Sequence, residues 1–125
     1  MREKGNLLLV EDDLATCEAM THVLQTENYH VSSAKSPREA IARFKENQID
    51  VVLLDLSLED EGGWPVFLKL KELRPDLPII VTSGRTDELA NAFSSQASGV
   101  LEKPYDVMVL LELLDRLKGA PLQSA

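Results

Sequence analysis

Two apolar runs in this sequence end on carboxylates, and those carboxylates are the residues best suited to chemistry. Residues 6–10 are followed by Glu11 and Asp12, and residues 51–54 are followed by Asp55. Apolar runs bounded by charge are typical of strands buried on both faces of a parallel sheet, whose carboxyl ends share the edge where ligands bind. Carboxylates crowded at this edge repel one another, and a hard divalent cation relieves the repulsion. We therefore predict a Mg²⁺ site around Asp12 and Asp55.

Two later apolar runs bring a hydroxyl and an ammonium group to the same predicted edge. Residues 78–82 are followed by Ser83, and residues 98–101 lead to Lys103. A carboxylate such as Asp55 can attack phosphorus and form an aspartyl phosphate. A cation neutralises the incoming phosphate, a hydroxyl can donate to a phosphoryl oxygen, and a lysine supplies a compact positive charge. The set has the parts that phosphoryl transfer to an aspartate requires.

Short apolar runs alternate with amphipathic segments along the chain, which is typical of βα repeats. Ser36 and Glu39 form a capping box with Pro37 at the first helical position, so a helix should begin there. We interpret Asp13 as a helix cap rather than a metal ligand. We predict strands near 6–10, 29–34, 50–55, 78–82 and 98–101, helices that include residues 17–24, 37–44, 66–73, 89–93 and 105–118, and a frayed end over 119–125.

Composition and charge indicate one small soluble domain rather than a nucleic-acid or membrane protein. The chain has 125 residues, of which 44% are hydrophobic, and this length suits a single domain with its own core. A net charge of -8 argues against direct binding to nucleic acid or to an anionic membrane. The single cysteine, Cys17, cannot form an internal disulfide, and neither a signal peptide nor a long apolar span is evident, so we expect a cytoplasmic location.

Four segments in this order resemble the receiver domain of two-component response regulators. They are residues 8–13, residues 52–56 with Gly63 closing the following loop, residues 78–84 and residues 103–105. The resemblance covers nearly the whole chain and implies an α/β fold of the flavodoxin-like type, a doubly wound five-stranded parallel sheet with strand order 2-1-3-4-5. It also implies a receiver domain over residues 1–119 with a C-terminal tail over 120–125.

The resemblance assigns a role to each residue at the predicted edge. Asp55 corresponds to the phosphoacceptor, Ser83 to the switch hydroxyl and Lys103 to the lysine that contacts the phosphate. The implied ligands of Mg²⁺ are Glu11, Asp12, Asp55 and the backbone carbonyl of Ser57. The bond between Lys103 and Pro104 corresponds to a cis peptide in the family, which is plausible because X-Pro bonds adopt cis at low cost.

The sequence also departs from the family pattern in the segment after Ser83. Val100 stands where many receivers have a Tyr or Phe that rotates on activation, and Gln96 replaces a customary Gly. The stretch from Ser83 to Lys103 is about two residues shorter than usual. We therefore expect a fourth helix that is truncated or irregular, and a signal transmitted through Ser83 and residues 84–96.

The function implied is a phosphorylation switch, not an enzyme, that receives its phosphoryl group from a histidine kinase or histidine phosphotransfer protein. An alternative is a degenerate receiver that binds partners without being phosphorylated. An aspartyl phosphatase generally needs a second Asp two residues after the nucleophile, where this chain has Ser57. A flavin or nucleotide module needs a phosphate-binding loop after the first strand, where Glu11 and Asp12 would repel phosphate.

Apolar residues on the fifth predicted helix exceed what one face of a sheet can bury. Met108, Val109 and Leu113 lie outside its inward stripe. Exposed apolar patches commonly mark interaction sites, and the receiver family often uses helix four, strand five and helix five for partners or dimers. We therefore expect Val109 and Leu113 to bind a downstream protein or a second copy of the chain. Residues 59–61 are interpreted as a solvated acidic loop rather than a second metal site.

Overall fold

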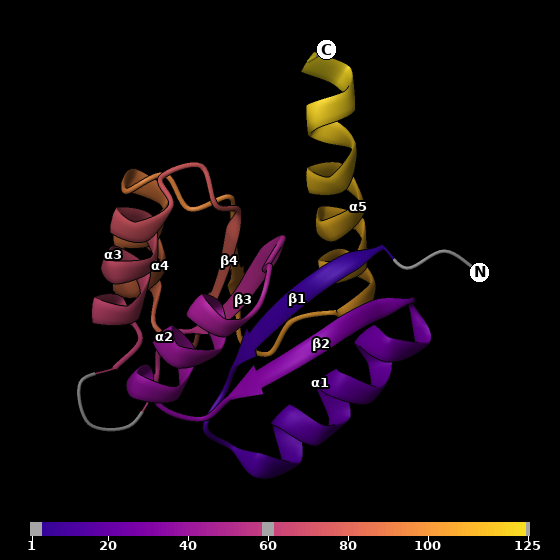
Figure 1. Cartoon of the computed structure of the whole chain (residues 1–125). Helices are drawn as coiled ribbons and strands as arrows, with labels where there is room; N and C mark the ends of the chain where they lie inside the picture. Colours follow the sequence, from indigo (N-terminus) through magenta and orange to yellow (C-terminus); the bar gives the residue numbers. More distant parts are fainter. Residues whose placement is uncertain (1–3, 59–61, 125) are drawn as a thin grey trace.

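The computed structural model describes residues 4–58 and 62–124, with the backbone alone for residues 118–124, and strands and helices alternate throughout (Figure 1). The five predicted strands are confirmed to within one residue at each end. In chain order the elements are β1 (Gly5–Val10), α1 (Leu14–Thr26), β2 (Tyr29–Ala34), α2 (Pro37–Glu46), β3 (Val51–Asp55), α3 (Trp64–Leu73), β4 (Ile79–Ser83), α4 (Thr86–Ser94), β5 (Gly99–Glu102) and α5 (Val107–Ser124).

The strands form one parallel sheet in the order β2-β1-β3-β4-β5, which confirms the predicted doubly wound, flavodoxin-like fold. Within this sheet Asp55 of β3 aligns with Thr82 of β4, and Ser83 aligns with Glu102 of β5. Because all the strands run in one direction, their carboxyl ends meet at one edge. That edge collects the side chains that follow β1, β3, β4 and β5.

Helices cover both faces of the sheet and build two hydrophobic cores (Figure 1). On one face, α2, α3 and α4 contribute buried side chains such as Ala40, Phe67 and Ala92. On the other face, Leu24 of α1 and Leu110 of α5 are fully buried. Successive strand residues point alternately to the two faces, so each central strand is apolar along its whole length. This double burial explains the unbroken apolar runs of the sequence.

Side-chain caps fix the starts of the first two helices. Asp13 is the N-cap of α1, and its Oδ2 accepts a hydrogen bond from the backbone N–H of Thr16 at 2.9 Å, which confirms its interpretation as a cap. Ser36 caps α2 by accepting from the N–H of Glu39 at 3.1 Å, while the Glu39 carboxylate accepts from the N–H of Lys35 at 2.8 Å. Each cap satisfies backbone donors that have no partner within the helix.

The helix α4 is short, as predicted, but it is regular. After its last turn Gln96 adopts a left-handed conformation with φ 68°. The N–H of Gln96 donates to the carbonyl of Phe93 at 3.1 Å, and the N–H of Ala97 donates to the carbonyl of Ala92 at 3.0 Å. These two bonds form a Schellman motif, in which the left-handed position is usually glycine. Of the two expected alternatives, a truncated or an irregular helix, the structure shows a short and regular one, and Gln96 ends it in the same way that glycine would.

The last helix differs from the sequence prediction in its length. We expected α5 to end near Lys118, and it continues to Ser124 through Gly119 and Pro121, which commonly end helices. Extending an existing helix requires much less free energy than nucleating a new one, and the leucine-rich turns before Gly119 provide the established helix. No helix within residues 4–58 and 62–124 combines the length and apolar character needed to cross a membrane.

Leu113 is partly buried and packs against the hydrophobic core, so it is less exposed than its predicted place on an interaction surface would require. A Cβ atom added to Gly99 of β5 would lie only 2.4 Å from Cδ2 of Leu113. The absence of a side chain at position 99 therefore lets Leu113 pack directly against the strand. Its neighbours on α5 behave as expected, because Met108 and Val109 are 61% and 47% exposed.

Candidate functional site

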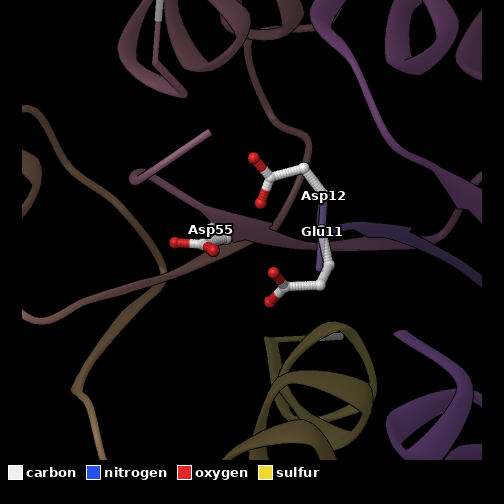
Figure 2. A group of neighbouring side chains, drawn as sticks. All are labelled: Glu11, Asp12 and Asp55. Carbon is white, nitrogen blue, oxygen red and sulfur yellow. The ribbon is translucent and has the colours of Figure 1, made fainter. Parts of the chain in front are cut away.

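Three carboxylates from β1 and β3 converge at the carboxyl edge of the sheet. Each of Glu11, Asp12 and Asp55 offers a carboxylate oxygen, and these oxygens lie within 4.8 Å of one another (Figure 2). Asp55 is 3% exposed and Glu11 is 5% exposed, while Asp12 is half-buried. Burial of like charges at this spacing is unfavourable unless a cation compensates them. The cluster is therefore a candidate site for a hard divalent cation, which prefers oxygen ligands.

Lys103 supplies the cationic side chain that meets this cluster. Its Nζ lies 2.8 Å from Oδ2 of Asp55 and 3.5 Å from Oε1 of Glu11. Partial burial on its own would lower the pKa of Lys103, but the hydrogen bond to Asp55 and the charges of both carboxylates outweigh it, and the pKa is raised. The lysine is therefore held in its charged form. The peptide bond that joins Lys103 to Pro104 is cis, as the resemblance implied.

The pKa of Glu11 is raised, mainly because burial disfavours its charged form. The backbone N–H of Asp13 opposes this by donating to Oε2 of Glu11 at 3.1 Å, and the nearby charge of Asp55 adds to the increase in the pKa of Glu11. Lys103 lowers the pKa of Glu11, but by less than burial raises it. The geometry thus places Glu11 where a second positive charge would be favourable.

Backbone contacts fix the position of Asp55. Its Oδ1 accepts a hydrogen bond from the backbone N–H of Ser57 at 2.9 Å. The N–H of Gly63 donates to the carbonyl of Leu56 at 2.9 Å and closes the intervening loop. A Cβ atom at Gly63 would lie 2.5 Å from the carbonyl oxygen of Asp55, so only glycine permits this close approach. The loop therefore returns directly to the backbone of Asp55.

Ser83 lies at the end of β4 and is fully buried. Its hydroxyl donates to Oε1 of Glu88, a residue in the first turns of α4, and accepts from the N–H of Arg85 at 3.0 Å. Alternation along β4 places Val81 and Ser83 on the sheet face that α4 covers, since Val81 belongs to the core shared with α4. In this structure Ser83 is therefore bonded to α4, while Lys103 is bonded to Asp55.

The structure brings most of the predicted site residues together and adds one that the sequence analysis missed. Glu11, Asp12 and Asp55 lie within 4.8 Å of one another through their carboxylate oxygens, Lys103 contacts Glu11 and Asp55, and Ser57 contacts Asp55 through its backbone N–H. Glu88 was overlooked because the helix after Ser83 was expected to be truncated or irregular. An acidic residue in the first turn of a helix that begins just after Ser83 was the available signal. Residues 59–61, interpreted as a solvated loop, lie outside the described residues.

Comparison with known proteins gives the family. The chain matches the response regulator receiver domain over residues 7–115. It therefore belongs to the response regulator receiver domain family, the receiver modules of two-component signal transduction. The transcriptional regulatory protein ZraR of Salmonella typhimurium is 30% identical, in an alignment that covers 100% of this chain and 30% of ZraR. The chain thus corresponds to less than one third of that relative.

Solved structures agree with the fold. A response regulator receiver domain protein from Clostridium thermocellum has a TM-score of 0.89 at 22% identity, covering 97% of this chain and 99% of the other. The response regulator protein TrrA from Thermotoga maritima, solved in complex with Mg²⁺ and BeF, has a TM-score of 0.82 at 24% identity. That comparison covers 94% of this chain and 99% of TrrA. At these sequence identities the likeness establishes the fold alone.

Proposed function

We propose that this receiver accepts a phosphoryl group on Asp55 from a partner histidine kinase or histidine phosphotransfer protein, in a reaction that depends on Mg²⁺. The observation that carries the proposal is the convergence of Glu11, Asp12 and Asp55 within 4.8 Å, with Nζ of Lys103 2.8 Å from Asp55. An oxygen of Asp55 forms a bond to phosphorus while the phosphorus–nitrogen bond of a phosphohistidine breaks, and the histidine leaves. The protein is thus a switch rather than a metabolic enzyme.

The acidic cluster fits the proposed ion. Glu11, Asp12 and Asp55 would hold Mg²⁺, together with the backbone carbonyl of Ser57, because hard cations take oxygen ligands. When bound, the ion neutralises the charge of the phosphoryl oxygens and of the carboxylates around it. The presence of Mg²⁺ and BeF in the structure of TrrA supports this assignment by likeness of fold.

Two further side chains complete the proposed reaction. Lys103 already contacts Asp55, so its ammonium group is within reach of oxygens on a phosphoryl group bound there. Ser83 donates its hydroxyl to a phosphoryl oxygen, which requires the side chain to change its present hydrogen bond. The cytoplasmic location and the division into a domain over 1–119 and a tail over 120–125 stay predictions.

The proposed output surface lies on α4, β5 and α5. Phe93 of α4 is 72% exposed, and the exposed apolar side chains of Met108 and Val109 lie on α5. We assign this surface to a downstream protein or to a second copy of the chain. Val109→Asp should lower association in sedimentation while leaving phosphorylation of Asp55 intact, and unchanged association would contradict the assignment.

The central experiment is incubation with Mg²⁺ and acetyl phosphate, followed by intact mass spectrometry. The wild-type chain should gain one phosphate that hydroxylamine removes, because an acyl phosphate is labile to this nucleophile. Asp55→Asn should abolish the adduct. Asp13→Asn is a matched control, since Asp13 is exposed and caps α1 beside the cluster, and it should be labelled normally. A wild-type chain without an adduct would refute the proposal and favour a receiver that acts without phosphorylation.

A further inference from the structure

In this structure the hydroxyl of Ser83 already donates its hydrogen bond to a residue of α4. A serine hydroxyl has one proton to donate, and that of Ser83 is donated to the carboxylate of Glu88. Its oxygen also accepts from the N–H of Arg85 at 3.0 Å, and the side chain is completely buried. Ser83 therefore cannot donate to a phosphoryl group on Asp55 until it releases Glu88.

We propose that Glu88 is a positioning residue that holds Ser83 away from the phosphoacceptor and thereby sets the cost of switching. The inference rests on the proposed function, because it concerns the competition between Glu88 and a phosphoryl oxygen for one hydroxyl proton. A hydrogen bond to a charged acceptor is among the stronger ones in proteins. Phosphorylation must break this hydrogen bond, so the energy of the bond opposes the phosphorylated conformation. The same bond links Ser83 directly to the first turns of α4.

A small cavity next to Glu88 can accommodate the Glu88 side chain once its hydrogen bond to Ser83 is broken. It has a volume of about 170 Å³ and is lined by Leu56, Trp64, Glu88 and Asn91. This volume is large enough for several water molecules, which can solvate a displaced carboxylate. Glu88 therefore lines the same cavity as Trp64, the only tryptophan of the sequence. Movement of Glu88 should therefore change the fluorescence of Trp64.

An acidic residue in the first turn of a helix is also explained by the helix dipole alone. Asp87 supplies the comparison, because it lies in the same turn of α4 and forms an exposed ion pair with Arg85 at 2.9 Å. A helix-dipole role predicts similar effects of neutralising Asp87 and Glu88. A positioning role predicts an effect of Glu88 that depends on the hydroxyl of Ser83.

The test is a titration of the full chain with Mg²⁺ and beryllofluoride, followed by Trp64 fluorescence and by calorimetry. Glu88→Ala should bind beryllofluoride about threefold to tenfold more tightly than the wild type, since the hydroxyl no longer has to leave a charged acceptor. Glu88→Gln keeps a neutral acceptor and should have a smaller effect in the same direction. Asp87→Asn should match the wild type.

A double-mutant cycle with Ser83→Ala makes the inference specific. Without the hydroxyl there is no competition, so adding Glu88→Ala to Ser83→Ala should leave the affinity unchanged. Equal gains from Glu88→Ala in both backgrounds, or no gain in the wild-type background, would overturn the role of Glu88 while leaving the proposed function in place. A wild-type chain that binds no beryllofluoride would overturn the proposed function and this inference together.

Discussion

Replacing Lys103 with methionine should destabilise the protein in the absence of a metal ion. The substitution keeps most of the side-chain volume but removes the ammonium group that lies 2.8 Å from Asp55 and 3.5 Å from Glu11. At an effective dielectric constant of about 20, the nearer contact alone corresponds to about 6 kcal/mol of direct attraction. Desolvation offsets most of this, and the Lys103 side chain is still 32% exposed. We expect a net loss of about 1 to 3 kcal/mol in the free energy of unfolding.

The pH dependence of this loss follows from the raised pKa of Glu11. A carboxyl group whose pKa is higher in the folded state than its ordinary value of 4.5 binds its proton more tightly when folded. Its charged form therefore costs stability as the pH rises through the raised pKa, and Lys103 offsets part of that cost. The destabilisation caused by Lys103→Met should accordingly be largest at neutral pH and smaller near pH 4.5.

Urea denaturation without metal, at neutral and acidic pH, measures both effects. Lys69→Met is the matched control, because Lys69 forms an exposed ion pair with Glu72 on α3 at 3.5 Å. Exposed pairs of this kind contribute at most about 1 kcal/mol, so the control should change little. Saturating Mg²⁺ should recover part of the stability of Lys103→Met by adding a cation to the cluster. A variant as stable as the wild type at neutral pH would refute the electrostatic account of Lys103.

Two further predictions concern the metal and the end of α4. Mg²⁺ at about ten times its Kd should stabilise the wild type by about 1.4 kcal/mol. In thermal melts Asp12→Ala should blunt this gain and Asp13→Ala should keep it, and equal responses would contradict the assignment of Asp12. Gln96→Gly should raise the unfolding free energy by about 1 kcal/mol, because it relieves a left-handed residue. Asn28→Gly, at φ 71°, should gain less in the same urea titration, and an equal gain would argue against this reasoning.

The sequence predicted the sheet and the acidic cluster because both follow from short-range pattern. Buried parallel strands appear as apolar runs, and a charged residue at the end of such a run lies at a known edge. Glu11, Asp12 and Asp55 could therefore be placed near one another without knowing any side-chain conformation. These carboxylates lie close to Lys103 because each of the residues follows a strand that ends at the same edge of the sheet.

The features that the sequence analysis missed depend on contacts between elements. Leu113 was assigned to the surface by helical periodicity, which takes no account of how the side chains on the facing strands differ in size. Gly99 has no Cβ atom, which leaves space on β5 for Leu113, so the partial burial of this leucine depends on a residue of another element. The contact between Ser83 and Glu88 likewise requires the direction in which α4 leaves the sheet. Such pairings come from packing geometry, which local pattern does not encode.

The contact between Leu113 and Gly99 holds α5 in a fixed position against β5. A side chain seated in the space left by a missing Cβ atom opposes both sliding and rotation of its helix, because either movement drives the side chain into the strand. If Asp55 is phosphorylated as proposed, we therefore expect Val109 and Met108 to keep their present positions. A partner that grips α5 alone would be unable to distinguish the two states, so its selectivity for the phosphorylated form has to come from what it touches on α4.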